Sequence, residues 1–300
     1  MPARVATFSL VACDPSAQAW GVAVASKFPA VGARVPWAAS NAGAIATQSY
    51  ANTSYGPRGL AMMAAGASAS QTLEALLSAD EGREHRQVGL VDGQGRAATF
   101  TGAECLAWAG GRSGQGFAAQ GNLLAGAAVL DAMLDKYLAS DGDLPERLLS
   151  ALLAGDRAGG DRRGRQSAAL LVVKPQSGYG GYDDVWLDYR VDDHPDPVPE
   201  LTRLLAIHRL YFDKSPKGDE VPLQGETLAG LQRIMSRLGF YQGPIDGIYT
   251  PATRTCLEAF LGNENFEDRT DFERGRIDRP VVEYLQHRFA PPQVDGQPDA

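Results

Sequence analysis

Residues 7–27, TFSLVACDPSAQAWGVAVASK, decide the fold of this chain. Residues 7–12 are β-branched, aromatic or apolar, and residues 20–25 form a second apolar run. The sequence Asp14-Pro15-Ser16 between the two runs is typical of a turn. The stretch therefore predicts a β-hairpin whose first strand begins at Thr7. Thr7 and Ser9 are two residues apart, so their side chains are expected on the same face of that strand.

The composition excludes several classes of protein. The chain has 300 residues, 44% of them hydrophobic, and a net charge of −8, which argues against nucleic acid or an anionic membrane as a partner. The three cysteines, Cys13, Cys105 and Cys256, have neither metal-binding nor disulfide spacing, and no cofactor motif is present, so we expect no metal and no cofactor. The opening MPARVATF has no apolar core typical of a signal peptide, and no apolar run reaches membrane length. We expect a cytoplasmic protein.

The order of the expected elements indicates an α+β fold. Strands are expected at residues 37–49, 88–91, 97–101, 116–120, 167–173 and 185–191, and helices at 60–79, 123–138, 145–154 and 201–212. Residues 213–222, DKSPKGDEVP, are polar and contain proline, which is typical of a linker. We therefore expect one domain at 1–212, a linker at 213–222, a helical domain at 223–290 and a tail at 291–300.

Two resemblances follow from specific motifs. The segments TFSLVACDP, TQSYANTSYGPRGL, AAQGNLLAG and GGDRRGRQSAALLVV make residues 1–212 similar to an uncharacterised bacterial family, domain of unknown function 1028, with an N-terminal-nucleophile (Ntn) hydrolase-like fold. This resemblance implies a four-layer αββα sandwich but no substrate. The pattern LQ…LGFYQGPIDGIYTPATR…LEAF resembles a helical module of the peptidoglycan-binding type. It implies a small all-α C-terminal domain with cell-wall glycan as a possible partner.

The resemblance to Ntn hydrolases makes Thr7 the first candidate nucleophile. In such enzymes a Thr, Ser or Cys that has become the first residue uses its own α-amine as the base. The chemistry requires cleavage between Ala6 and Thr7, and the alternative is that Thr7 is an ordinary strand residue. Ser9 is the second candidate nucleophile. Lys27 follows the second strand, where its charge could lower the pKa of the nucleophile, or it could simply be solvated.

The candidate substrate-binding residues come from several segments of the chain. Gln120, Gly121 and Asn122 precede the expected helix at 123–138 and could hold an oxyanion at its positive end, with Asn122 as an ordinary helix cap as the alternative. Asp161 and Arg162 lie in an Arg-rich loop that could clamp a carboxylate or form surface ion pairs. The remaining candidates are Ser26, which follows the second strand, Gln48, near the end of the strand region expected at 37–49, and Asn52 and Tyr55, which lie in the loop after it.

These residues favour an Ntn-type amidohydrolase that cleaves an amide in a small anionic molecule. One alternative is a non-catalytic binding protein that keeps the sandwich and lacks processing. Another is a glycan-binding protein that acts through the C-terminal module. Proteins with Ntn folds often assemble, so we also expect a homo-oligomer.

Overall fold

The computed structural model describes residues 7–213 and 219–290, and the chain divides into two compact units between Leu204 and Leu205. The expected linker at 213–222 contains a short strand, β11 (Glu220–Pro222), and its residues 214–218 lie outside the described residues. The expected tail at 291–300 also lies outside them.

The opening hairpin is confirmed and forms the centre of a six-stranded antiparallel sheet. Its turn is held by the Asp14 carboxylate, which accepts hydrogen bonds from the backbone N–H groups of Ser16 and Ala17. The strand order is β10-β9-β2-β1-β8-β7. The strands are β1 (Thr7–Asp14), β2 (Ala19–Ser26), β7 (Gly110–Gly114), β8 (Phe117–Asn122), β9 (Ser167–Val173) and β10 (Val185–Val191).

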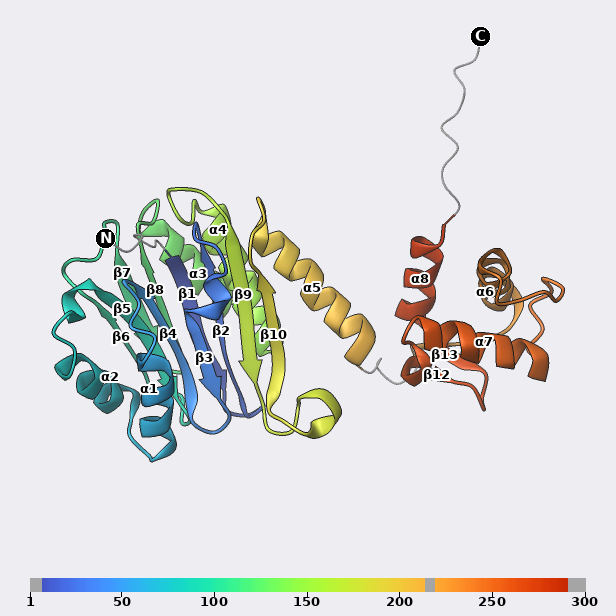
Figure 1. Ribbon diagram of the computed structural model, residues 1–300, viewed down its shortest axis with the longest axis horizontal. Helices are drawn as coiled ribbons and strands as arrows, with labels where there is room; N and C mark the ends of the chain where they lie inside the picture. Colours follow the sequence, from blue (N-terminus) through green and yellow to red (C-terminus); the bar gives the residue numbers. More distant parts are fainter. Residues whose placement is uncertain (1–6, 214–218, 291–300) are drawn as a thin grey trace, which may run out of the picture. The chain divides into compact units, whose positions relative to one another are not determined.

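A second, four-stranded antiparallel sheet packs face to face against the first (Figure 1). Small and β-branched side chains, among them Val11, Val24, Ala44 and Val91, fill much of the space between the sheets. The small residues let the two backbones approach closely. The strand order is β3-β4-β5-β6, and the strands are β3 (Pro36–Ala39), β4 (Gly43–Ser49), β5 (Arg86–Asp92) and β6 (Ala97–Thr101).

Helices cover the outer face of each sheet. On the four-stranded sheet, α1 (Tyr55–Ala64) and α2 (Ala69–Ser78) bury Tyr55 and Leu76 against Ile45 and Leu90. On the six-stranded sheet, α3 (Ala128–Leu138) and α4 (Leu144–Arg157) pack on β1, β2 and β8. The N-terminal unit therefore has the expected α+β architecture, with two antiparallel sheets and helices outside them. α5 (Pro197–Phe212) follows β10.

The structure divides one expected helix and begins another later than expected. The expected helix at 60–79 is two helices, because Gly66 adopts a left-handed φ of +97° and Ser68 begins α2 with a capping box that includes Gln71. The expected helix at 123–138 begins only at Ala128. Strand β8 continues through Asn122, so Gly121 and Asn122 are strand residues and not the turn before a helix.

The C-terminal unit is mostly helical, and the all-α expectation for residues 223–290 is wrong. Helices α6 (Gly225–Leu238), α7 (Pro251–Asn263) and α8 (Arg279–Arg288) surround an apolar core, and α6 is capped by Gly239, which has a φ of +84°. A three-stranded antiparallel sheet, β11-β13-β12, accompanies them, with β12 (Thr270–Asp271) and β13 (Arg276–Asp278). These strands are too short to show a period of two in the sequence.

Gln232 explains why the LQ…DG pattern of this unit is spaced as it is. Its side chain is fully buried, and its carbonyl oxygen accepts hydrogen bonds from the backbone N–H groups of Asp246 and Gly247. Its amide nitrogen donates to the Tyr241 hydroxyl and to the Asp246 carboxylate. One glutamine on α6 therefore fixes the turn that leads to α7.

Candidate functional site

Thr7 lies at the edge of the inter-sheet space, as the first residue of the central strand β1. It pairs with Ser26 on β2 and with Asn122 on β8, and its side chain is fully buried. The Thr7 hydroxyl donates to Ser26 Oγ at 3.1 Å, and the Thr7 carbonyl accepts from Gln48 Nε2 at 3.2 Å. The structure thus brings together three of the expected site residues, Thr7, Ser26 and Gln48, from strands far apart in the sequence.

A cluster of buried amide side chains joins the two sheets next to Thr7. Gln48 Nε2 donates to Gln87 Oε1 at 2.8 Å, and Asn122 Nδ2 donates to the same oxygen at 2.9 Å. Gln87 in turn donates to the Gly121 carbonyl at 2.8 Å. Gln87 was not among the expected site residues, since a single glutamine before an apolar strand looks like an ordinary strand end. Each amide satisfies another, so the cluster holds the sheets in register.

Ser9 belongs to this cluster, and its hydroxyl proton is already used in a hydrogen bond to Gln48. Ser9 Oγ donates to Gln48 Oε1 at 2.6 Å and accepts from Gln120 Nε2 at 2.6 Å. Neutral amides cannot take a proton from a hydroxyl near neutral pH, so neither neighbour can act as a general base for Ser9. This geometry favours a structural role for Ser9.

The arrangement expected for Gln120, Gly121 and Asn122 is not found. All three lie inside β8, which is paired with β1 on one side and with β7 on the other. A helix N-terminus therefore does not follow them directly, since α3 begins only at Ala128. The sequence Gln-Gly-Asn looked like a turn, but strand pairing on both sides overrides that local preference.

A cavity of about 410 Å³ adjoins this cluster through Gln48. Ser49, at the end of β4, lines it with a left-handed φ of +65°, which is uncommon for a residue with a side chain. Two arginines, Arg34 and Arg86, are among the residues that line it. The other lining residues are Phe28, Val31, Val35, Tyr50, Ala51 and Thr53.

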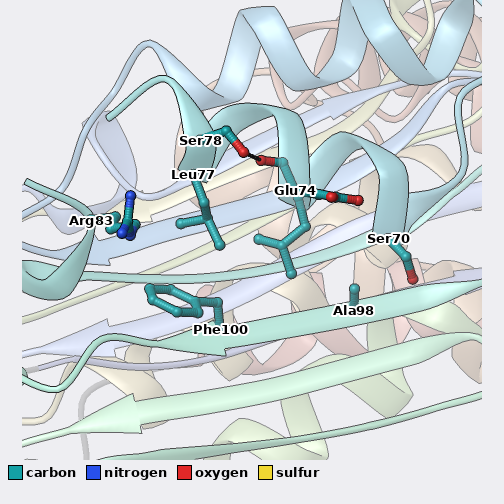
Figure 2. A pocket seen from close by; sticks show the side chains of 8 residues that line it. Ser70, Glu74, Leu77, Ser78, Arg83, Ala98 and Phe100 are labelled. Carbon is teal, nitrogen blue, oxygen red and sulfur yellow. Dashed lines mark hydrogen bonds between the residues drawn. The ribbon is translucent and has the colours of Figure 1, made fainter. Parts of the chain in front are cut away.

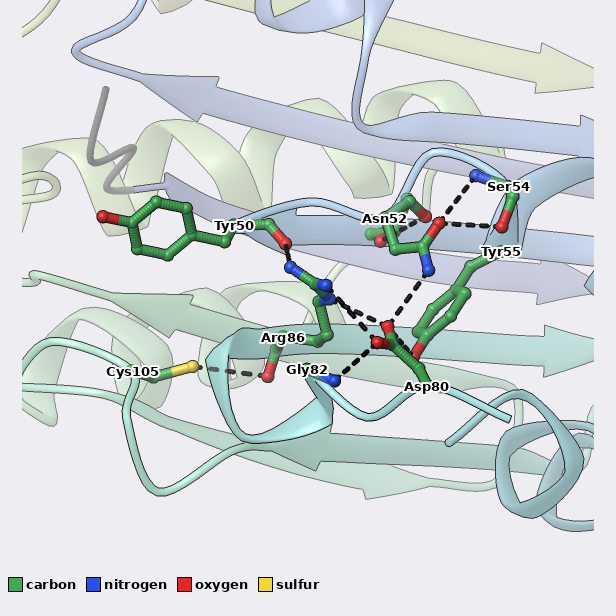
Figure 3. Close-up of polar contacts among 9 residues, drawn as sticks. Tyr50, Asn52, Ser54, Tyr55, Asp80, Gly82, Arg86 and Cys105 are labelled. Carbon is green, nitrogen blue, oxygen red and sulfur yellow. Dashed lines mark hydrogen bonds and ion pairs between the residues drawn. The ribbon is translucent and has the colours of Figure 1, made fainter. Parts of the chain in front are cut away.

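Asn52 and Tyr55 both bind Asp80 in the structure (Figure 3). Asn52 Nδ2 donates to the Asp80 carboxylate at 3.0 Å, and the Tyr55 hydroxyl donates to the same carboxylate at 2.8 Å. Arg86 Nε donates to it at 2.9 Å, and this bond is the main reason why the pKa of Asp80 lies well below its usual range. Burial, followed by the bond to Asp80, raises the pKa of Tyr55. These contacts favour a loop-ordering role for Asn52 and Tyr55.

Lys27 and the Arg-rich loop lie on another side of Thr7. The Lys27 side chain is exposed, and its backbone N–H donates to the buried Asp161 carboxylate at 2.8 Å. Asp161 also pairs with Arg163 at 2.8 Å, so its charge is already compensated. Arg162 is exposed and lines a separate cavity of about 650 Å³ together with Asp156 and Arg165. The structure does not bring Asp161 or Arg162 to the amide cluster.

A third cavity, of about 530 Å³, lies between α2 and β6 (Figure 2). Its lining includes the apolar side chains of Leu73, Leu77 and Phe100 and the charged residues Glu74 and Arg83. None of the expected site residues lines it. Within residues 7–213 and 219–290, no three His, Cys, Asp or Glu side chains converge as metal ligands, and none of the helices has the length and apolar character needed to span a bilayer.

Comparisons with known proteins agree with this architecture. The model of DUF1028, described as a "Family of unknown function", matches residues 7–201, and that of a "Putative peptidoglycan binding domain" matches residues 211–285. A crystal structure of protein SPO2555 from Silicibacter pomeroyi, of the DUF1028 family, is 34% identical with a TM-score of 0.62, over 68% of this chain and 86% of that one. No curated protein matches. The resemblances expected from the motifs are thereby confirmed, and the chain belongs to the DUF1028 family.

Proposed function

We propose that the N-terminal unit is an Ntn-type amidohydrolase with an αββα sandwich, and that Thr7 is its nucleophile. The observation that supports it most is the place of Thr7. It is the first residue of the central strand, its hydroxyl faces Ser26 at 3.1 Å, and it contacts Gln48, which lines a cavity. The family match also begins at this residue.

The proposed reaction needs the peptide bond between Ala6 and Thr7 to be hydrolysed first. The new α-amine of Thr7 then takes the proton from Oγ1, and Oγ1 attacks the substrate carbonyl carbon. The leaving amine departs with that proton, so an ester to Thr7 remains. A water molecule activated by the same α-amine hydrolyses the ester and releases the acid. Uncleaved, the backbone nitrogen of Thr7 is an amide without a basic lone pair.

The test joins intact-mass spectrometry with a screen of small amides. The proposal predicts a species that begins at Thr7, and turnover that is lost in Thr7→Ala and retained in part in Thr7→Ser, because serine keeps the hydroxyl. Thr202→Ala, which removes an exposed threonine from α5, is the matched control and should behave as the unmodified protein. Equal turnover by Thr7→Ala would eliminate Thr7 from the mechanism.

A non-catalytic binding protein on the same scaffold is the competing function. The complete burial of Thr7 in the intact chain and the mutual saturation of the amide cluster favour it. This alternative predicts a single mass that includes residue 6 and no turnover by any variant.

For the C-terminal unit we propose binding to cell-wall glycan, supported by the match over residues 211–285. Co-sedimentation of the full chain with purified peptidoglycan tests it, and insoluble cellulose serves as the control matrix. The protein is expected in the pellet with peptidoglycan alone. Recovery in the supernatant at every peptidoglycan concentration would contradict the proposal.

A further inference from the structure

The cavity beside Gln48 has an uneven distribution of charge. Most of its lining is apolar or neutral, and Arg34 and Arg86 are the two charged residues that line it. Its volume, about 410 Å³, lies within the range of small-molecule sites. Such a site selects a ligand that has an apolar body and an anionic group.

Arg86 is not the group that would meet the anion. Its Nε and one terminal nitrogen both face the Asp80 carboxylate, at 2.9 and 3.4 Å, and its other terminal nitrogen donates to the Tyr50 carbonyl at 2.7 Å (Figure 3). The opposite charge of Asp80 therefore largely offsets its own. Arg86 fixes the wall of the cavity and contributes little net charge to it.

Arg34 differs from Arg86 in that no ion-pair partner among the described residues offsets its charge. Its side chain is exposed, and within the described part of the chain its guanidinium forms neither an ion pair nor a hydrogen bond. Its backbone is nevertheless held firmly, because its N–H donates to the Val31 carbonyl at 3.1 Å and its carbonyl accepts from Trp37 Nε1 at 3.2 Å. The preceding turn is anchored where Val31 N–H donates to Ser167 Oγ. Arg34 thus carries an uncompensated charge on a segment of anchored backbone that lines the cavity.

We propose that this cavity binds a carboxylate-bearing substrate, of the class of N-acylated apolar amino acids, with the carboxylate on Arg34. The apolar side chain would pack on Phe28, Val31 and Val35, which line the same cavity. The scissile amide would then lie toward Gln48 and Thr7, which are in contact. A planar guanidinium suits a carboxylate because it donates two parallel hydrogen bonds. The inference rests on the proposed function, since it specifies the substrate of that site.

The test measures binding separately from turnover. N-acetyl-L-leucine and its uncharged amide, N-acetyl-L-leucinamide, are titrated by calorimetry into the Thr7→Ala variant, which leaves both probes intact. We expect the carboxylate to bind at least about tenfold more tightly, since one charge-assisted bidentate contact is worth that much or more. In Arg34→Gln the preference should vanish, and Arg34→Lys should restore part of it.

Arg58→Gln is the matched control, because it removes one exposed arginine of α1 that does not line the cavity. It should keep the full preference. Equal binding of the two probes, failure of both to bind, or a preference that survives Arg34→Gln would each overturn the inference. Turnover that persists in Thr7→Ala would instead overturn the proposed function and leave the binding result standing, so the two failures are distinguishable.

Discussion

Replacing Asp80 by asparagine should destabilise the N-terminal unit more than any exposed carboxylate replacement. The Asp80 side chain is 11% exposed and accepts hydrogen bonds from Arg86, Tyr55, Asn52 and the backbone N–H of Gly82. It ties the start of β5 to α1 and to the loop before α1. Asparagine keeps the shape but removes the charge that compensates Arg86.

The magnitude follows from the burial of the pair. Breaking a buried ion pair by removal of one partner costs about 3–5 kcal/mol. Arg86 is 21% exposed and keeps its bond to the Tyr50 carbonyl, so we expect the lower end, about 3 kcal/mol of unfolding free energy. Asp188→Asn is the matched control. Asp188 pairs with Arg190 at the surface with 36% of its side chain exposed, and such pairs contribute about 1 kcal/mol or less.

The stability that Asp80 contributes depends on pH in a definite direction. The pKa of Asp80 is lower in the folded protein than its ordinary value, mainly through the bond from Arg86. The stability that it contributes is therefore fully present above the ordinary carboxyl pKa, about 3.9, and is lost as the pH falls toward the lower folded value. The difference between the unmodified protein and Asp80→Asn should be constant above about pH 5 and shrink below about pH 4.

The assay must resolve the two compact units, because a chain of this kind can unfold in more than one transition. Amide hydrogen exchange of the α1 and β5 peptides, read by mass spectrometry, reports the N-terminal unit alone. A loss of protection in Asp80→Asn no greater than in Asp188→Asn would refute the reasoning. It would mean that the carboxylate is solvated in solution.

Three further substitutions or probes test other parts of the structure. In Gly89→Ala the new Cβ would stand 1.8 Å from Gln120 Oε1, so the midpoint of thermal unfolding should fall, whereas Gly262→Ala on α7, with open space around it, should leave it unchanged or higher. Burial and the nearby Asp92 and Asp14 raise the pKa of Cys13 to about 12. Iodoacetamide at pH 8 should therefore alkylate Cys13 far more slowly than Cys256 in the native protein. In denaturant the two cysteines should react at similar rates. Arg269→Ala leaves the Asp278 carboxylate buried and unpaired, so it should lower the unfolding free energy of the C-terminal unit by about 3–5 kcal/mol. Amide exchange of α8 peptides measures this loss. A loss smaller than that caused by Asp188→Asn would contradict the buried pairing.

Local chemistry was enough to predict part of this protein. The hairpin at 7–27, the Gly-containing turn between β5 and β6, and the end of α6 at Gly239 all follow from side chains within a few residues of the feature. Strand β7 (Gly110–Gly114) was missed, because its sequence GGRSG has no apolar alternation and it is a strand only through pairing with β8.

The site depended on contacts that no local pattern records. Gln48 and Gln87 read as isolated polar residues, yet they bond across 39 positions to form the buried amide cluster. Asn122 has the preference of a turn or cap, but its pairing with Thr7 of β1 keeps it in β8. Arg34 and Arg86 also meet one cavity only after folding. The sequence by itself determined the strand that begins at Thr7 and the family of the chain, because short-range propensity and motif spacing suffice for these. Tertiary structure alone decided which polar groups are hydrogen-bonded and which arginine of the cavity lacks an ion-pair partner among the described residues. The partners of a buried polar group depend on which strand the fold places opposite it.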